Sequence, residues 1–496
     1  MNISKKFVFY IFLIINFICW SVIQLFRNII SIDSMEAISW GELISFGTNK
    51  HPPLSGWIMA SFYNLFGQHD ILVYVLGQIC VLVGFIYIYK LAKNFLSEEK
   101  AICSVLVLQT CFYYNYYIYV NSFNCNVLLM ALWPIVTYYF YNATTHNNIK
   151  DWIFFGLFSG LAFLGKYQIV FLFLAMLLYL IIAKREYFKQ KGMYLAILVG
   201  ALTIAPHVVW LFNTDFFSFA YMVDRTQSTT HNMPSLLSKL GHVIYPIKFI
   251  GDQILATLSC LAFFLILAIQ AKNISINKKL YKNKDLLFLL VNGICPIIFQ
   301  GGMGLITGAR VPGIWGSIMV SLTGILIFYF INIDFKEITF NFAIKLAYLT
   351  LVIQLVAVGI FALINTKFFI AYPKDKIFNE FNEIWNIETN NSPIKYIAGH
   401  MDYIFQFKTY HPRHPHVILE TFGHTNPWVD YDDIEKSGVI VLAKDEDDVI
   451  QYTLETLPFV KENTIKPHKY TFDVCNKIGK CKQDEFYYVI VKPKEK

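Results

Sequence analysis

The sequence predicts a polytopic, all-α membrane protein with about eleven transmembrane helices, followed by a soluble C-terminal domain of α/β or α+β class. Three observations support this prediction. Of the 496 residues, 56% are hydrophobic and only 15% are charged, whereas roughly a quarter of the residues of a soluble domain are charged. The apolar residues lie in runs of about 20, the length that crosses a bilayer. Near residue 366 the composition changes, because charged residues and short β-rich runs become frequent.

The apolar runs define the expected membrane domain, residues 1–365. The first run could be a cleaved signal peptide, but no clear small-residue cleavage site precedes Arg27, so a retained helix is preferred. The expected spans cover residues 7–26, 70–89, 101–119, 124–141, 152–165, 167–183, 193–212, 252–271, 285–300, 313–333 and 343–364.

Lysine and arginine residues between the spans predict the orientation, because positively charged flanks stay on the cytoplasmic side. With the N-terminus inside, about 17 of the 41 Lys and Arg residues lie in cytoplasmic segments, 7 in outer loops and 17 in the tail. An odd number of spans then places the C-terminus outside. The net charge of +7 therefore indicates orientation and does not indicate a nucleic-acid partner.

The tail, residues 366–496, contains β-rich runs at 438–442 and 486–491, which predict strands of a soluble domain. Two of the nine cysteines, Cys475 and Cys481, lie in this tail. An oxidising outer compartment would permit a disulfide between them. Two free thiols are the alternative. The other seven cysteines lie in or beside apolar spans, where a thiol is usually a small hydrophobic group.

The first outer loop, residues 27–69, concentrates polar groups. Its first part predicts a short surface helix in which Asp33 and Glu36 are neighbours, with apolar residues on another side: Met35, Ile38, Trp40 and Leu43. The loop then reaches Lys50 and His51 before two prolines that fix an extended backbone. A carboxylate can take a proton from a hydroxyl while cations offset charge on a leaving phosphate, so the loop suits group transfer. The alternative is that these charges simply pair in solvent.

Several motifs share their order with a known family. They are Asp33, Glu36, Gly41 and His51-Pro52-Pro53-Leu54 with Trp57; Phe123-Asn124-Cys125-Asn126; Trp133-Pro134; Gly165-Lys166-Tyr167; Ala205-Pro206-His207; the segment from Arg310 to Trp315; and tail segments near 396, 427 and 438. In this order they resemble the GT-C glycosyltransferases of the protein O-mannosyltransferase type. The bacterial branch of that family includes the lipid A aminoarabinose transferase and the galacturonosyl transferases of rhizobial lipopolysaccharide.

The resemblance implies a GT-C membrane domain that transfers a sugar, with inversion, from a polyprenyl phosphate, usually undecaprenyl phosphate, to an acceptor. The reaction would take place at the periplasmic face of a bacterial inner membrane. Asp33 matches the first-loop catalytic acid of the family and is expected to be the general base, with Glu36 as its helper or a substrate ligand. Lys50 and His51 match positions where cations approach the donor phosphate.

The second outer loop departs from the family pattern. Several members have an acidic residue there, whereas this chain offers Asn124 and Asn126 as weaker substrate-binding candidates. Asparagine oxygens are poor ligands for a divalent cation, so the residues argue against a metal without excluding one. Lys166, inferred to lie on the outer side, is either a turn residue or a contact of the donor phosphate. Arg310 offers forked donors suited to phosphate.

The long outer loop, residues 213–250, contains Asp224 and Arg225 and is expected to be a substrate gate, with an ordinary solvated loop as the alternative. The acceptor is expected to be lipid A, lipopolysaccharide or another envelope glycan. Three alternatives stay open: a protein O-glycosyltransferase, a flippase for lipid-linked sugars, and a ligase that moves whole glycans. Membrane lipids are expected partners, and nucleic acid is not.

Overall fold

The computed structural model describes residues 4–42, 45–219, 235–271, 274–276, 283–333, 335–419 and 429–494. The chain divides into two compact units. The first comprises Met1–Ile23, Ser45–Ser55 and Tyr74–Ala357, and the second comprises Gln24–Ile44, Gly56–Val73 and Val358–Lys496. The first outer loop is therefore shared, because Asp33 and Glu36 belong to the second unit while Lys50 and His51 belong to the first.

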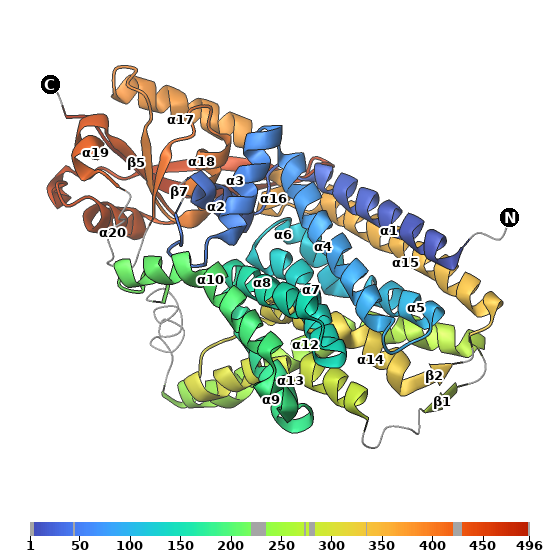
Figure 1. Ribbon diagram of the computed structural model, residues 1–496. Helices are drawn as coiled ribbons and strands as arrows, with labels where there is room; N and C mark the ends of the chain where they lie inside the picture. The colour runs from blue at the N-terminus through green and yellow to red at the C-terminus, as the bar shows by residue number, and fades with distance from the viewer. Residues whose placement is uncertain are drawn as a thin grey trace. The chain divides into compact units, whose positions relative to one another are not determined.

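The first unit is built from helices (Figure 1). Its described α-helices are α1 (Lys5–Val22), α4 (Asp70–Ala92, from Tyr74 on), α5 (Glu98–Leu108), α6 (Tyr116–Asn121), α7 (Cys125–His146), α8 (Ile149–Gly165), α9 (Val170–Ala183), α10 (Lys191–Asn213), α12 (Ser235–Ala271), α13 (Lys284–Thr307), α14 (Thr323–Phe330) and α15 (Glu337–Ile364, as far as Ala357). Its short 3-10 helices are η2 (Phe112–Tyr114), η3 (Tyr167–Ile169), η4 (Arg185–Lys189), η5 (Gly313–Gly316) and η6 (Met319–Leu322), whereas η1 (Ile23–Phe26) passes into the second unit. Two short antiparallel strands, β1 (Ile274–Ile276) and β2 (Ile331–Ile333), pair with each other.

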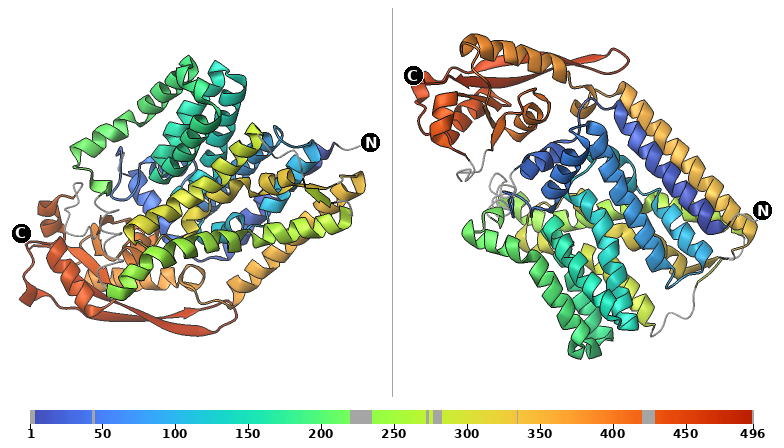
Figure 2. Two further views of the ribbon diagram at one scale, coloured as in Figure 1. Left: turned by 90° about the horizontal axis from the view of Figure 1, so that it is seen from below. Right: turned by 45° about the horizontal axis from the view of Figure 1, so that its top comes forward.

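Among the described residues, six helices are long and apolar enough to cross a membrane: α1 with η1, α4, α10, Leu240–Ala271 of α12, α13 and α15. The other expected spans fall on helices that are shorter or less apolar, such as α7, α8 and α9. The total of eleven spans therefore stays a prediction. Helix α1 lies beside α15, with the rings of Phe12 and Tyr348 5.2 Å apart (Figure 2).

Helices α8 and α10 approach each other closely, and small residues make this approach feasible. A Cβ atom added at Gly156 would lie 2.3 Å from the carbonyl oxygen of Ala196, and one added at Gly160 would lie 2.6 Å from the Cβ of Thr203. The spacing of Gly156 and Gly160 is the small-residue pattern that lets membrane helices pack backbone to backbone. Any side chain at Gly156 would push the two helices apart.

The span expected at 101–119 is wrong as a single helix. Helix α5 ends at Leu108, and η2 and α6 follow. Asn115, with backbone angles outside the helical region, accepts a hydrogen bond from the N–H of Tyr116, and its amide donates to the carbonyl of Thr110. Short polar side chains of this kind compete for backbone groups and interrupt helices.

Two other expected boundaries also differ. Residues 313–333 form η5, η6, α14 and the strand β2 instead of one continuous helix, and two glycines lie at the ends of η5. Part of the expected outer loop 213–250 is helical, because α12 begins at Ser235 and continues for 37 residues. Apolar runs predict that a segment is buried in lipid or protein, but they do not fix where a helix begins.

The second unit combines two helices of the first outer loop with the tail. Its elements are α2 (Ile32–Glu42), α3 (Leu54–Phe66, from Gly56 on), α16 (Phe368–Ala371), α17 (Lys374–Glu388), β3 (Tyr396–Gly399), α18 (Met401–Tyr410), β4 (His416–Leu419), α19 (Tyr431–Ser437), β5 (Val439–Ala443), α20 (Glu446–Thr456), η7 (Glu462–Thr464), β6 (His468–Cys475) and β7 (Cys481–Val491). The predicted mixture of strands and helices in the tail is thus confirmed.

The sheet of the second unit has the order β4-β3-β5-β7-β6. Strands β3, β4 and β5 are parallel, whereas β7 is antiparallel to both β5 and β6. Val441 lies at the centre of the sheet, paired with Ala398 on one side and Val489 on the other. All three are buried, as expected of strands covered on both faces. Helix α18 also packs against α2, which attaches the first outer loop to the tail domain.

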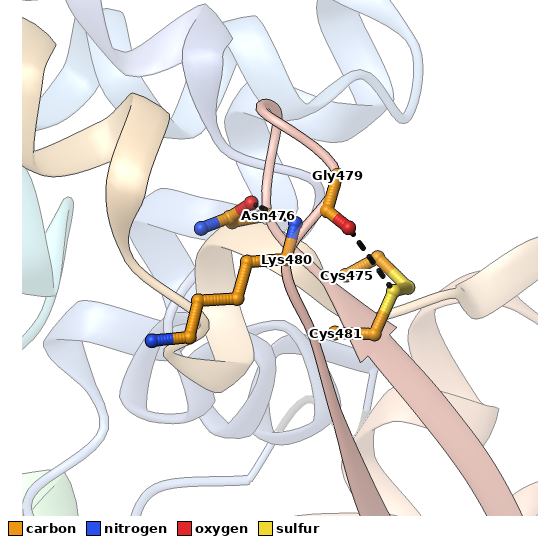
Figure 3. The surroundings of a disulfide bond; sticks show 5 residues. All are labelled: Cys475, Asn476, Gly479, Lys480 and Cys481. Carbon is orange, nitrogen blue, oxygen red and sulfur yellow. Dashed lines mark hydrogen bonds between the residues drawn. A yellow bond between two sulfur atoms is a disulfide. The ribbon is translucent and has the colours of Figure 1, made fainter.

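The disulfide that the sequence leaves open, between Cys475 and Cys481, is present at the end of the β6–β7 hairpin (Figure 3). A Cys475→Ser/Cys481→Ser variant should lower the free energy of unfolding of this hairpin by about 2 kcal/mol, because the cross-link restricts a loop of a few residues in the unfolded chain. Hydrogen exchange of β6 and β7 in detergent measures this loss. A reductant should weaken the protection of β6 and β7 from hydrogen exchange in the parent protein and should have no effect in the variant. If the parent protein without reductant and the variant show equal protection, the prediction is wrong.

Candidate functional site

The two carboxylates predicted to act in catalysis, Asp33 and Glu36, lie on helix α2 of the second unit. Asp33 lies in its first turn with an exposed side chain, and the hydroxyls of Ser31 and Ser34 are 2.8 Å apart beside it. Met35 and Ile38 are buried, as expected for the apolar side. Glu36, expected to be a surface neighbour of Asp33, is instead 4% exposed. Of the two carboxylates, only that of Asp33 is exposed.

A small cavity of about 120 Å³ lies near α2 within the second unit, and the sequence did not predict it. Its polar lining includes Asp70, at the start of α4, together with Lys408 and Tyr410 of α18. The hydroxyl of Tyr410 donates to Asp70 at 3.1 Å and accepts from the backbone N–H of Ile30 at 2.8 Å. Tyr410 therefore ties the segment before Asp33 to the tail domain.

In the first unit, the middle of the first outer loop forms a tight turn at residues 48–51. The hydroxyl of Thr48 donates to the carbonyl of His51 at 2.8 Å and accepts from its N–H at 2.9 Å. Two more distant residues hold this turn: Ser218 donates to the carbonyl of Thr48, and His207 of α10 contacts the carbonyl of Phe46 at 2.6 Å. The backbone just before Lys50 and His51 is thus held by two residues that are distant in the sequence.

Lys166 is buried at the end of α8 and belongs to a connected polar group. Its ammonium donates to the side-chain oxygen of Asn126 at 2.6 Å and lies 4.9 Å from the ring centre of Trp315. The amide of Asn126 in turn donates to the hydroxyl of Tyr117 at 3.0 Å. Asn126, at the start of α7, therefore holds the ammonium of Lys166 in a defined position.

His51 lies within the electrostatic reach of Lys166. Loss of hydration, together with the positive charges of Lys166 and Lys50, holds the pKa of His51 well below its usual range. His51 is therefore neutral at pH 7, while the two lysines supply positive charge. Lys166, far from Lys50 in the sequence, thus adds its charge to that of Lys50 around the neutral ring of His51. We call these residues the cation cluster: Lys50, His51 and Lys166.

The N-terminus of α7 adds to this cluster. Asn124 caps the helix, because its side chain accepts from the N–H of Val127 at 3.0 Å. Asn126, in the first turn, reaches Lys166. A helix N-terminus carries partial positive charge, which favours an anion nearby. Within the described ranges, no group of three or more His, Cys, Asp or Glu residues is arranged to hold a metal ion.

The remaining candidates lie elsewhere. Arg310 is exposed on the segment between α13 and η5, after Gly308 ends α13 in a left-handed conformation. Gln168 donates to the side chain of Gln300 and to the carbonyl of Trp315, so the segment after Arg310 is fixed to α13. Asp224 and Arg225 lie outside the described residues.

Comparison with known proteins supports the resemblance found in the sequence. Residues 50–210 match the family model described as dolichyl-phosphate-mannose-protein mannosyltransferase. The lipid A galacturonosyltransferase RgtD of Rhizobium johnstonii is 21% identical over 209 residues, which cover 40% of this chain and 42% of the relative. The chain therefore matches less than half the length of this curated relative.

The fold can be compared over a longer range. The crystal structure of ArnT from Cupriavidus metallidurans bound to undecaprenyl phosphate aligns with a TM-score of 0.63 at 13% identity, covering 97% of each chain. The predicted GT-C fold of a multi-pass membrane protein is thus confirmed. The cation cluster, Asn126 and His207 lie inside the segment that matches the family model, whereas Asp33 precedes it.

Proposed function

We propose that this chain is a membrane glycosyltransferase that moves a sugar from a polyprenyl phosphate to an acceptor at the outer face of a bacterial inner membrane. The cation cluster is the observation that carries the proposal. Its member Lys166 is a buried lysine bound to Asn126 at the N-terminus of α7, inside the segment that matches the dolichyl-phosphate-mannose family model. Positive charge at this place matches the charge of a phosphate that leaves the sugar.

The proposed reaction begins with the acceptor hydroxyl, whose proton passes to Asp33. The acceptor oxygen then attacks the anomeric carbon from the side opposite the phosphate, and the bond between that carbon and the phosphate oxygen breaks. The polyprenyl phosphate leaves with both bonding electrons, and Lys50, His51 and Lys166 stabilise its additional negative charge. Attack from the opposite side inverts the anomeric configuration. Glu36 and Arg310 are proposed as further substrate contacts, whereas an essential divalent cation is not part of the proposal.

The orientation is part of the proposal. With the N-terminus in the cytoplasm, the lysine-rich segments stay inside, and the first outer loop and the tail face the periplasm. The disulfide between Cys475 and Cys481 supports this side, since such bonds persist in oxidising compartments. Modification of an exposed tail lysine by a membrane-impermeant reagent in intact spheroplasts would test the orientation.

The acceptor is proposed to be lipid A or another envelope glycan, in keeping with the similarity to RgtD. A protein hydroxyl is the second candidate, because the matching family model is named for protein mannosyltransferases. Mass spectrometry of lipid A and of envelope glycoproteins from a deletion strain separates the two. A missing sugar on lipid A supports the first candidate, and missing protein glycans support the second.

The enzyme itself can be tested with purified protein in proteoliposomes and a radiolabelled polyprenyl-phosphate sugar. We expect labelled acceptor together with free polyprenyl phosphate when an envelope extract is supplied. A flippase would instead move intact donor between leaflets without releasing polyprenyl phosphate. Transport without release would therefore overturn the proposal, as would transfer from a pyrophosphate carrier alone.

Donor binding should become tighter as the pH falls from about 8 to about 6, by at most tenfold per pH unit for a single linked proton. The pKa of His51 is lowered in the free protein, and a nearby phosphate anion should raise it, so binding takes up a proton. The donor phosphodiester keeps one negative charge over this range. The KM for the donor across this range measures the effect.

A His51→Gln variant should lose this dependence while retaining part of its activity, because Gln keeps a hydrogen-bond donor but does not titrate. If the variant keeps the pH dependence of the parent protein, another group is responsible and the assignment to His51 is wrong.

A further inference from the structure

The β6–β7 hairpin of the second unit ends in a compact basic tip, which we define as residues 475–482. The disulfide closes this tip, and the side chain of Asn476 accepts from the backbone N–H of Lys480 at 2.8 Å (Figure 3). The tip therefore has two internal constraints, one covalent and one through a buried asparagine. It is a defined structure rather than an open loop.

The tip lies where membrane helices end. The amide of Asn476 donates to the carbonyl of Ile364, the last residue of the apolar helix α15, at 2.7 Å. The ammonium of Lys477 donates to the side chain of Asn28 at 2.8 Å, and Asn28 follows the apolar segment Lys5–Phe26 by two residues. Both contacts therefore join the tip to the points at which the chain leaves an apolar, membrane-crossing segment.

The end of α15 has the features of a helix that meets lipid. Ile360 and Ile364 are 53% and 54% exposed, and lipid is the environment that covers apolar side chains on a membrane helix. Just beyond, the ammonium of Lys367 lies 5.3 Å from the ring centre of Phe361. Lysines that fold back over the apolar end of a helix mark the bilayer interface.

The surface of the tip matches this position. Ile478 is 66% exposed at its end, and Lys477, Lys480 and Lys482 are exposed around it. The segment 475–482 contains three lysines and no acidic residue. In Figure 3 the Lys480 side chain extends away from the disulfide. An exposed apolar residue among cations is suited to the boundary between acyl chains and anionic headgroups.

We propose that the disulfide-closed tip is a membrane-surface anchor, in which Ile478 enters the lipid interface while Lys480 and Lys482 contact anionic phospholipid headgroups. The anchor would hold the tail domain against the bilayer at the ends of its own membrane segments. This inference depends on the membrane position of α15 and not on the proposed glycosyltransferase activity.

Photo-crosslinking of the full-length protein in nanodiscs tests the anchor. A photoreactive phenylalanine analogue replaces Ile478 in one variant and Ile387 in the matched control, because Ile387 is a 78% exposed isoleucine on α17 of the same unit. Mass spectrometry should find phospholipid adducts at position 478 and only background at position 387. Equal yields at both positions, or adducts to protein instead of lipid, would overturn the proposal.

The charge of the tip is tested in nanodiscs made from equal amounts of phosphatidylcholine and phosphatidylglycerol. Adducts at position 478 should be enriched in phosphatidylglycerol by about threefold or more over the bulk lipid. Lys480→Gln/Lys482→Gln should return the ratio to that of the bulk, while Lys477, which contacts Asn28, stays in place. Adducts without enrichment in the parent protein would contradict the role of the lysines.

Discussion

Replacing Asp33 by Asn should lower turnover by about 10²- to 10⁴-fold, the usual contribution of a positioned general base. The amide has the size and shape of the carboxylate but does not accept a proton from the acceptor hydroxyl at neutral pH. Asp33 is exposed in the first turn of α2, so the change should cost about 0.3–1 kcal/mol of stability through the helix dipole. The measurement is release of polyprenyl phosphate in proteoliposomes at saturating donor.

The matched control is Asp375→Asn. Asp375 also lies in the first turn of a helix, α17 of the same unit, so the two variants remove the same charge from equivalent helical positions. The turnover of Asp375→Asn should stay within about twofold of that of the parent protein, because this variant has the same small effect on helix stability as Asp33→Asn but leaves the general base in place. Full turnover in Asp33→Asn, at normal expression, would make the general-base assignment wrong and would direct attention to the buried carboxylate of Glu36.

The fold was predictable where it depends on patterns along the chain. Runs of apolar residues placed the helices α1, α4, α10, α13 and α15, and two β-rich runs placed the strands β5 and β7 of the tail. The pattern failed where local polar groups intervene, as at Asn115, which caps α6 inside an apolar run. The pattern also did not predict which segments of the chain make up each of the two units, because apolar periodicity does not say which surface covers α2. Its partner, α18, follows about 360 residues later.

The candidate site was predictable to a smaller extent. Lys50 was visible in the sequence before His51 and two prolines, and Lys166 was visible as a charged residue between two apolar runs. The partners that hold these residues could not be predicted, because Asn126 and Lys166 are 40 residues apart in the sequence and come into contact only in the folded protein. His207 was visible in a motif, but its contact with Phe46, 161 residues away, gave no signal. Asp70, which lines the cavity in the second unit, was not predicted; its position as an acidic residue at the start of an expected span was the signal that could have identified it.

Replacing Asn126 by Asp should raise the KM for the donor by about tenfold to a hundredfold, with a smaller effect on turnover. The side-chain oxygen of Asn126 already accepts a hydrogen bond from Lys166 at 2.6 Å. A carboxylate at the same place keeps that hydrogen bond and adds a negative charge. Lys166 is buried, where charges interact more strongly than in water, so the new carboxylate should cancel much of its attraction for phosphate. Initial rates at varied donor concentration separate KM from turnover.

Asn124→Asp is the matched control, two residues earlier at the same helix N-terminus. Asn124 caps α7 through its side-chain oxygen, and Asp is an equally good cap, so this variant adds the same charge without losing the structural role. If both variants weaken donor binding equally, the charge acts through the general field of the loop and not through Lys166.

A gain of activity on adding Mg²⁺ or Mn²⁺ to Asn126→Asp would also contradict the prediction, because it would mean that this position supports a metal site. Since no described cluster provides further ligands, we expect metal to leave the variant impaired.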